Sequence, residues 1–191
     1  MRVDTTVVET NVHYPTDSSL LGDGVRVLVR PMKKITKLVG EVGTKLRDRN
    51  YSVKRRVFDI ARAARSKAKQ RSEKLTRAYD QLLNSTSRVV GQAKRFSAEI
   101  AAGVKRSTNL LAQLKLEGLR QTLDEMMPRV KQVMKQTRAR IHRGDTRSED
   151  KLLSAFEPSP EIIRKGKSGK PNEFWQDGEV AGSRKPDRDR F

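Results

Sequence analysis

The chain has 191 residues, of which 35% are hydrophobic and 34% are charged, and its formal net charge is +19 at pH 7. A charge of this size predicts a polyanionic partner, with nucleic acid as the first expectation and an anionic membrane surface as the second. Cysteine is absent, which excludes disulfide bonds and cysteine-based zinc sites. The sequence has no N-terminal signal segment and no apolar run of about 20 residues. We therefore expect a cytoplasmic protein that does not span a membrane.

The opening stretch, residues 2–12, is rich in valine and threonine and predicts a β-strand, because β-branched side chains suit a packed, pleated surface. It contains a carboxylate, Asp4, which is costly to bury unless it is paired or holds a metal ion. From the residues alone, Asp4 is equally consistent with an edge-strand aspartate that faces water. The polar cluster after Pro15 ends the strand and offers helix N-caps, and we expect Asp17 or Ser18 to be the cap.

A first helix is predicted over residues 16–30, because apolar side chains recur there at helical spacing. These side chains are Leu20, Leu21, Val25 and Leu28. Gly22 and Gly24 weaken the pattern, since glycine disfavours a helix interior. Pro31 should kink the helix, which then resumes to about Leu46.

A second apolar pattern follows a polar break at residues 48–50. It runs from residue 53 to residue 100 at steps of three and four. The pattern fits either one very long helix or two helices that break near residues 66–72. Gly103 is the expected stop.

A third long helix is predicted from Ser107 or Thr108 to Gly144, with a kink at Pro128. Its leucine and methionine stripe, from Leu111 to Met134, favours packing in a core, with a coiled-coil contact to a second chain as the alternative. Long amphipathic helices with short breaks pack as an antiparallel hairpin or small bundle. The predicted fold class is therefore mainly α, built from long antiparallel helices with a small β part.

The composition changes after Gly144. The turn that contains Lys165 and Lys167 lacks the Gly-x-x-x-x-Gly-Lys-(Ser/Thr) spacing of a nucleotide-binding loop. We interpret it as a flexible basic turn near DNA. Residues 175–191 are charged, contain glycine and proline and show no apolar periodicity, so we expect them to be disordered.

Two stretches resemble the bacterial insertion-sequence transposases of the Asp-Asp-Glu (DDE) class. Residues 4–26 read Asp-Thr-Thr-Val-Val-Glu-Thr-Asn-Val-His-Tyr-Pro-Thr-Asp-Ser-Ser-Leu-Leu-Gly-Asp-Gly-Val-Arg, like the first catalytic strand and loop of that family. Residues 156–171 contain Phe-Glu-Pro and Ile-Arg-Lys-Gly-Lys-Ser-Gly-Lys-Pro, like the segment that returns the family's chain to its catalytic sheet. The resemblance implies a ribonuclease-H-like sheet, with Asp4 as the first of three carboxylates that hold Mg²⁺ for DNA cleavage and strand transfer.

The resemblance, which stops after Phe174, and the composition of the tail together divide the chain into four parts. Residues 1–30 correspond to the first catalytic strand and following helix, 31–144 to a basic helical insertion, 145–174 to the return segment, and 175–191 to the disordered tail. Nothing after Phe174 matches the family's second Asp or its Glu. We therefore expect an incomplete transposase fragment that neither cuts nor joins DNA alone.

Three residues match the family's loop after the first strand, namely His13, Tyr14 and Asp17. The resemblance places them beside the active site. Elementary structural roles are the alternative, with Tyr14 packed and Asp17 as a helix cap.

Basic side chains are densest in the helical region. The residues that we expect to contact DNA are Lys54, Arg55, Arg56, Arg62, Arg65, Lys69, Lys165 and Lys167. Spacings of three and four place Arg62, Arg65 and Lys69 on one helical face. No helix-turn-helix or zinc-finger signature is present, so we expect backbone contacts that are non-specific and salt-sensitive.

Three functional hypotheses remain open on the sequence. The first is a DDE transposase fragment. The second is a non-catalytic, basic helical protein that binds DNA or RNA. The third is a helical interaction module that forms a homodimer through the stripe from Leu111 to Met134.

Overall fold

A computed structural model describes residues 16–67, 70–145, 152, 161–164 and 172–175. The described part is mainly helical, as predicted. Its elements in chain order are α1 (Asp17–Val39), α2 (Asn50–Arg65), α3 (Arg71–Ala101), α4 (Leu110–Arg143), β1 (Glu161–Arg164) and β2 (Asn172–Trp175). The four helices and the two strands belong to separate units of the chain, so each unit is described by itself.

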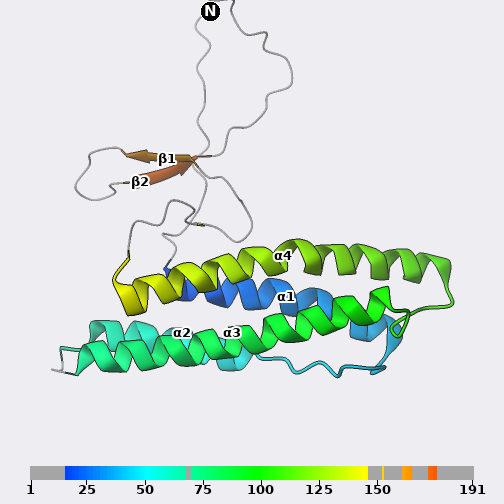
Figure 1. Cartoon of the computed structure of the whole chain (residues 1–191), viewed down its shortest axis with the longest axis horizontal. Coiled ribbons are helices and arrows are strands. Elements are labelled where there is room, and N and C mark those ends of the chain that lie inside the picture. Colours follow the sequence, from blue (N-terminus) through cyan, green and yellow to red (C-terminus); the bar gives the residue numbers. More distant parts are fainter. Residues whose placement is uncertain (1–15, 68–69, 146–151, 153–160, 165–171, 176–191) are drawn as a thin grey trace, which may run out of the picture. The chain divides into compact units, whose positions relative to one another are not determined.

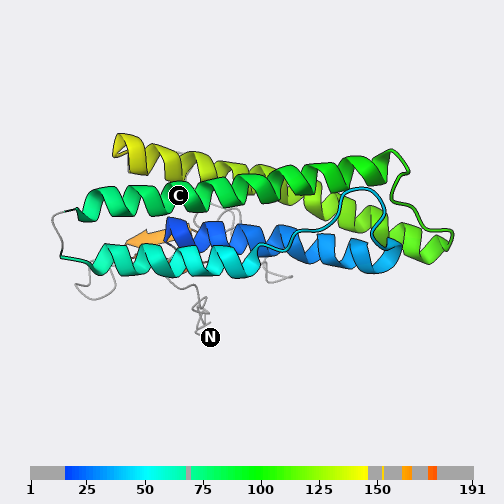
Figure 2. The ribbon, with the colours of Figure 1, turned by 90° about the horizontal axis from the view of Figure 1, so that it is seen from below.

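The helices form an antiparallel bundle (Figure 1). Within the described residues, α1 and α3 contact each other and both remaining helices, whereas α2 and α4 do not contact each other. α2 has 16 residues against the 31 of α3, so it covers only part of the length of α3. Residues 40–49 run as an irregular segment toward the start of α2 (Figure 2).

α1 begins earlier than the predicted caps imply, because its N-cap lies one residue before Asp17, the earlier of the two expected caps. The N-cap is Thr16, whose side chain accepts a hydrogen bond from the Ser19 backbone N–H while the Ser19 hydroxyl lies 3.0 Å from the Thr16 nitrogen. Pro31 is buried inside the continuous helix. The predicted extension to Leu46 is wrong, because the helix ends at Gly40, where φ is 73°. A positive φ favours glycine and stops the helix.

The second apolar pattern forms two helices, and the break lies where the two-helix alternative placed it. α2 ends at Arg65 and α3 begins at Arg71. α4 begins after Asn109, whose side-chain oxygen accepts a hydrogen bond from the Ala112 N–H at 3.2 Å. This start is two or three residues beyond the predicted one at Ser107 or Thr108, because asparagine is a strong N-cap. Gly144 ends α4 in a left-handed conformation, as predicted.

The core lies between the helices and uses the apolar faces that the spacing predicted. Its fully buried members include Leu21, Val25, Leu28, Met32, Ile35, Leu82, Val89, Phe96, Leu116 and Leu123. α1 and α4 approach closely at Gly24, because a Cβ atom placed there would lie 2.9 Å from Val130 Cγ2. Gly24 therefore marks a helix contact, although by propensity alone it weakens the predicted helix.

Two strands form the other described unit. β1 and β2 pair antiparallel, with Glu161 opposite Trp175 and Ile162 opposite Phe174. Trp175 thus belongs to a strand, so the predicted tail begins one residue too early. The rest of that tail and the strand predicted over residues 2–12 lie outside the described residues.

Candidate nucleic-acid interface

The predicted site residues fall into two groups. Asp4, Lys69, Lys165 and Lys167 lie outside the described residues. The others all lie on α2 and are Lys54, Arg55, Arg56, Arg62 and Arg65. The structure therefore bears on the helical part of the predicted DNA surface and not on the predicted catalytic carboxylate.

α2 presents an exposed cationic surface. Lys54, Arg55, Arg62 and Arg65 are exposed, and Asp59 is the one acidic residue of the helix. Arg62 and Arg65 occupy the last turn, where the helix dipole favours cations. We call Lys54, Arg55, Arg62 and Arg65 the α2 cations. Within the described residues, none of their side chains forms an ion pair.

Arg56 differs from its neighbours on α2. It is half-buried, and its guanidinium donates hydrogen bonds to the backbone carbonyl and the hydroxyl of Ser52 one turn earlier. Its Nε atom is buried without a partner in the structure. The Arg56 side chain is therefore committed in part to its own helix.

A hollow of about 590 Å³ lies between α1 and α2. Arg26, Arg30, Lys33 and Lys54 line it. Two of these cations are partly neutralised within the protein, since Arg26 pairs with Asp23 and Lys33 pairs with Asp48. Burial alone would raise the pKa of the Asp48 carboxyl, but hydrogen bonds and the Lys33 charge outweigh burial and lower that pKa.

A second hollow, of about 600 Å³, lies between the segment 40–49 and α3. We call it the arginine hollow. Its basic lining residues are Lys45, Arg47, Arg49, Arg88 and Arg95, and the lining contains no acidic residue. This group was not predicted from the sequence. The i, i+7 spacing of Arg88 and Arg95 was the only signal for it on α3, and the segment that completes the hollow was predicted as helix up to about Leu46 and as a polar break at residues 48–50.

The segment 40–49 is fixed to α3 by buried polar contacts. The Lys105 ammonium, whose side chain is 1% exposed, lies 3.3 Å from Glu99 Oε2 and donates hydrogen bonds to the carbonyls of Val42 and Thr44. The Thr44 N–H and hydroxyl donate to the same Glu99 carboxylate. Burial alone would raise the pKa of Glu99, but these hydrogen bonds and the Lys105 charge lower it. In the sequence Lys105 counts toward the surface charge, whereas the folded protein uses it in the interior.

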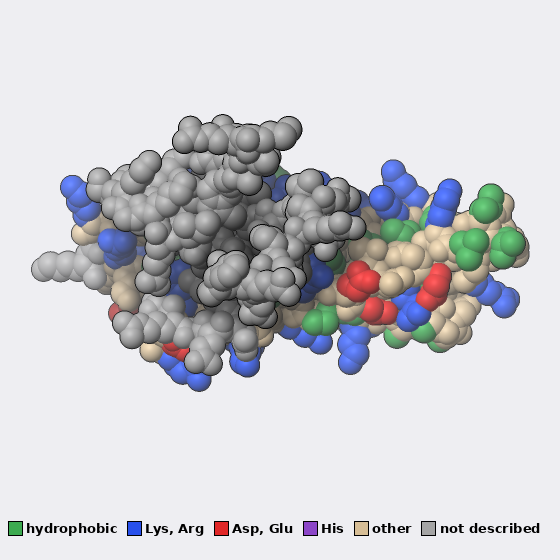
Figure 3. Space-filling view, turned by 90° about the horizontal axis from the view of Figure 1, so that it is seen from above, with side chains coloured by type: hydrophobic (Ala, Val, Ile, Leu, Met, Phe, Trp, Pro, Cys, Tyr) green, Lys and Arg blue, Asp and Glu red, His purple; other side chains and the backbone are tan. Residues whose placement is uncertain are grey.

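On the face shown in Figure 3, Lys and Arg side chains are scattered over the described part, and a smaller group of acidic side chains lies among them. Hydrophobic side chains gather at one end of this view. Exposed apolar residues near the α3–α4 connection include Val104, Leu110, Leu111 and Leu114. Beyond these exposed residues, the predicted leucine and methionine stripe packs in the core of the same chain, with Leu116, Leu123, Met127 and Met134 buried and Leu119 and Met126 partly buried.

No cluster of three His, Asp or Glu residues that could hold a metal ion occurs among the described residues. None of the helices that the structure describes is long and apolar enough to cross a membrane. No protein-family model, curated protein or solved structure matches the chain. The resemblance to DDE transposases therefore stays a hypothesis that rests on the residues that carry it.

Proposed function

We propose that the helical bundle binds the DNA backbone through the α2 cations. The observation that carries this proposal is the arrangement of α2, which exposes four cationic side chains beside a single carboxylate. Contacts of this kind neutralise phosphates and release counterions, so they give affinity without sequence preference. The net charge of +19 supports the same partner.

The test measures the affinity for a short DNA duplex of random sequence by fluorescence anisotropy at several salt concentrations. The variant Arg62→Gln/Arg65→Gln should weaken binding and reduce the slope of log K against log [salt] by about 2, because two phosphate contacts are lost. Lys131→Gln/Lys135→Gln is the matched control, since it removes the same charge from exposed positions on α4. A salt-independent affinity, or equal losses in both variants, would contradict the proposal.

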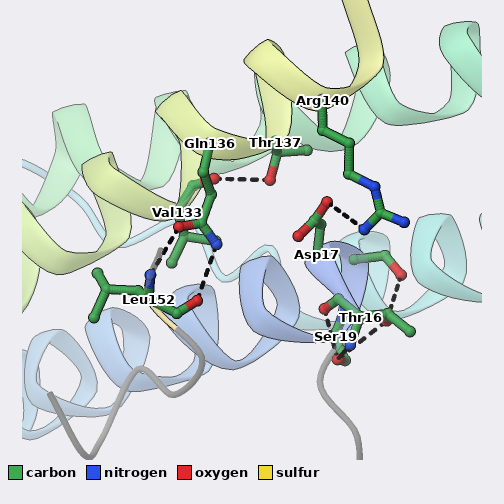
Figure 4. Close-up of polar contacts among 9 residues, drawn as sticks. Thr16, Asp17, Ser19, Val133, Gln136, Thr137, Arg140 and Leu152 are labelled. Carbon is green, nitrogen blue, oxygen red and sulfur yellow. Dashed lines mark hydrogen bonds and ion pairs between the residues drawn. The ribbon is translucent and has the colours of Figure 1, made fainter. Parts of the chain in front are cut away.

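A second proposal follows from where the chain enters and leaves the bundle. The start of α1 and the region after α4 lie at the same end, where Asp17 pairs with Arg140 and the Gln136 amide forms two hydrogen bonds of 3.0 Å with the Leu152 backbone (Figure 4). Adjacent chain ends suit a domain that is inserted into another. This supports the hypothesis that the bundle is the helical insertion of a DDE-class transposase, with the β hairpin in its return segment.

In this second proposal Asp4 is a catalytic residue by descent, Mg²⁺ is the cofactor that the resemblance implies, and DNA in the cytoplasm is the partner. Because the second Asp and the Glu of the family have no match in the chain, we propose that this polypeptide alone does not cleave DNA. A strand-cleavage assay with Mg²⁺ or Mn²⁺ tests this on the wild-type chain and on Asp4→Asn. Cleavage by the wild-type chain that disappears in Asp4→Asn would contradict the proposed inactivity.

A further inference from the structure

We infer that the arginine hollow binds a phosphate group of a nucleic-acid backbone. The inference rests on the proposed function for the identity of the partner, and it adds a second, built contact point apart from the α2 cations. The four guanidinium groups that line the hollow belong to Arg47, Arg49, Arg88 and Arg95. Arginine presents a planar fork of N–H donors that matches two phosphate oxygens at once.

Four of the five cations around the hollow have no charged partner within the described protein. None of the four arginine side chains forms an ion pair or a hydrogen bond with another described residue. Lys45 adds a fifth cation, and its pair with Glu41, at 3.5 Å, lies on the exposed surface. Like charges in one hollow repel each other, so they destabilise the folded chain unless an anion is bound. In the hollow between α1 and α2, by comparison, two of the four lining cations are paired, Arg26 with Asp23 and Lys33 with Asp48.

The hollow is held in shape by the contacts beneath it. Gln92, which is 4% exposed, donates a hydrogen bond of 2.7 Å to the Lys45 carbonyl. Thr44 is fixed to Glu99, and Gly43 allows that approach, since a Cβ atom at its φ of 68° would lie 2.8 Å from the Glu99 carboxylate. The backbone that carries Lys45, Arg47 and Arg49 is thereby fixed to α3. Cations on a fixed backbone lose less conformational freedom when they bind.

Small side chains leave room at the α3 side of the hollow. Arg88, Gly91, Gln92 and Arg95 follow the i, i+3, i+4, i+7 spacing of one helical face. Gly91 has no side chain, and a Cβ atom there would meet only Arg95 Nη1, at 3.9 Å. A larger residue at this position would therefore enter the hollow without a clash against the backbone.

Two variants test the inference by duplex binding in fluorescence anisotropy. Arg88→Gln/Arg95→Gln removes two charged guanidinium groups and should raise Kd by about tenfold or more, with a drop of about 2 in the salt slope. Gly91→Leu places an apolar side chain in the hollow and leaves the charge unchanged, so it should raise Kd to a similar extent. Its melting temperature should not fall, because leucine favours a helix over glycine. Lys131→Gln/Lys135→Gln, the control on α4, should change Kd less than about threefold, as expected for a general loss of charge.

The outcomes separate this inference from the proposed function. If the wild-type chain does not bind duplex DNA, the proposed function fails. If the wild-type chain binds duplex DNA, two results would overturn the arginine hollow alone. One is a Kd for Gly91→Leu equal to that of wild type, and the other is a Kd for Arg88→Gln/Arg95→Gln equal to that of the α4 control. Inorganic phosphate is the second probe. Inorganic phosphate that raises the melting temperature of the wild-type chain but not of Gly91→Leu would show that the hollow binds free phosphate. If the DNA affinity of Gly91→Leu also equals that of wild type, the assignment of the hollow to nucleic acid is wrong.

Discussion

The Asp17 carboxylate lies 3.0 Å from the Arg140 guanidinium and joins the first turn of α1 to the last turn of α4 (Figure 4). The Asp17 side chain is 3% exposed, whereas that of Arg140 is 48% exposed. Each charge also lies at the helix end that favours it, since helix N-termini attract anions and C-termini attract cations. One ion pair therefore fastens two helices at the point where the chain enters and leaves the bundle.

A double-mutant cycle should detect this pair. We expect Asp17→Asn and Arg140→Gln to couple by about 1–2 kcal/mol in the free energy of unfolding, because one partner is buried and the other is partly screened by water. Urea denaturation of the four proteins gives the coupling. The exposed Glu73–Arg77 pair on α3 is the control, and it should couple by less than about 0.5 kcal/mol. Equal coupling in both cycles would refute a special role for Asp17.

Lys105→Met should destabilise the bundle by about 2–4 kcal/mol. The substitution keeps the apolar stem but leaves Glu99 and two carbonyls of the segment 40–49 without their shared donor, and a broken buried pair is costly. Thermal and urea unfolding measure the change. The neighbouring Arg106 is exposed, so Arg106→Met should lie within about 0.5 kcal/mol of wild type. The assignment of Lys105 to the interior is wrong if the two variants are equally stable.

The Glu99 contacts should contribute a pH-dependent stability. The folded-state pKa of Glu99 lies below the ordinary value of 4.5, so its contribution is full above that value and is lost as the pH falls through the folded pKa. We compare wild type with Glu99→Gln, because other carboxyls titrate in the same range. The difference in the free energy of unfolding should be constant from pH 7 to about pH 5 and shrink at lower pH. A difference that stays constant down to pH 3 would contradict the prediction.

Two glycines on different helices should respond to alanine in opposite ways. Gly24→Ala should destabilise the bundle by about 1–2 kcal/mol, because the new methyl group would press on Val130. Gly118 lies on α4, and a Cβ atom added there would meet no neighbouring side chain within 4 Å. Gly118→Ala should therefore stabilise the bundle by about 0.5–1 kcal/mol through helix propensity. Melting temperatures measure both changes, and a stabilised Gly24→Ala would show that the two helices can separate without loss.

Self-association of the chain remains a prediction, and variants at the exposed apolar end of the bundle can test it. Leu111 and Leu114 are 68% and 62% exposed, and exposed apolar clusters mark contact surfaces. If a homodimer forms, Leu111→Gln/Leu114→Gln should raise its dissociation constant by about tenfold or more without a loss of stability. Sedimentation at several concentrations measures this. A dimer that the double variant leaves unchanged would exclude this surface.

The strongly periodic helices could be predicted because their apolar spacing is a local property. Leu21, Val25 and Leu28 are buried as the spacing indicates. The segment after Gly40 was mispredicted because Val42 and Leu46 continue the helical spacing although the chain has left the helix. The two positive φ angles, at Gly40 and Gly43, decide the outcome there. Apolar periodicity reflects the side chains alone and does not reveal this backbone requirement.

The α2 cations were visible in the sequence because they follow one another on a single helix. The arginine hollow was not, because Arg47 and Arg88 come from segments that only the tertiary fold brings together. Lys105 illustrates the complementary difficulty. A count of charges treats every lysine alike, whereas the position of an ammonium group depends on the carbonyls and the carboxylate around it.

The short length of α2 gives the bundle two unequal halves. In one half α2 packs on α1 and α3, and in the other the segment 40–49 lies beside α3 (Figure 2). Amide hydrogens in that segment have fewer backbone partners than helical ones, so the half near the segment should open first in hydrogen exchange. A bound polyanion there would slow this local opening, and exchange protection in residues 40–49 would then report occupancy of the arginine hollow directly.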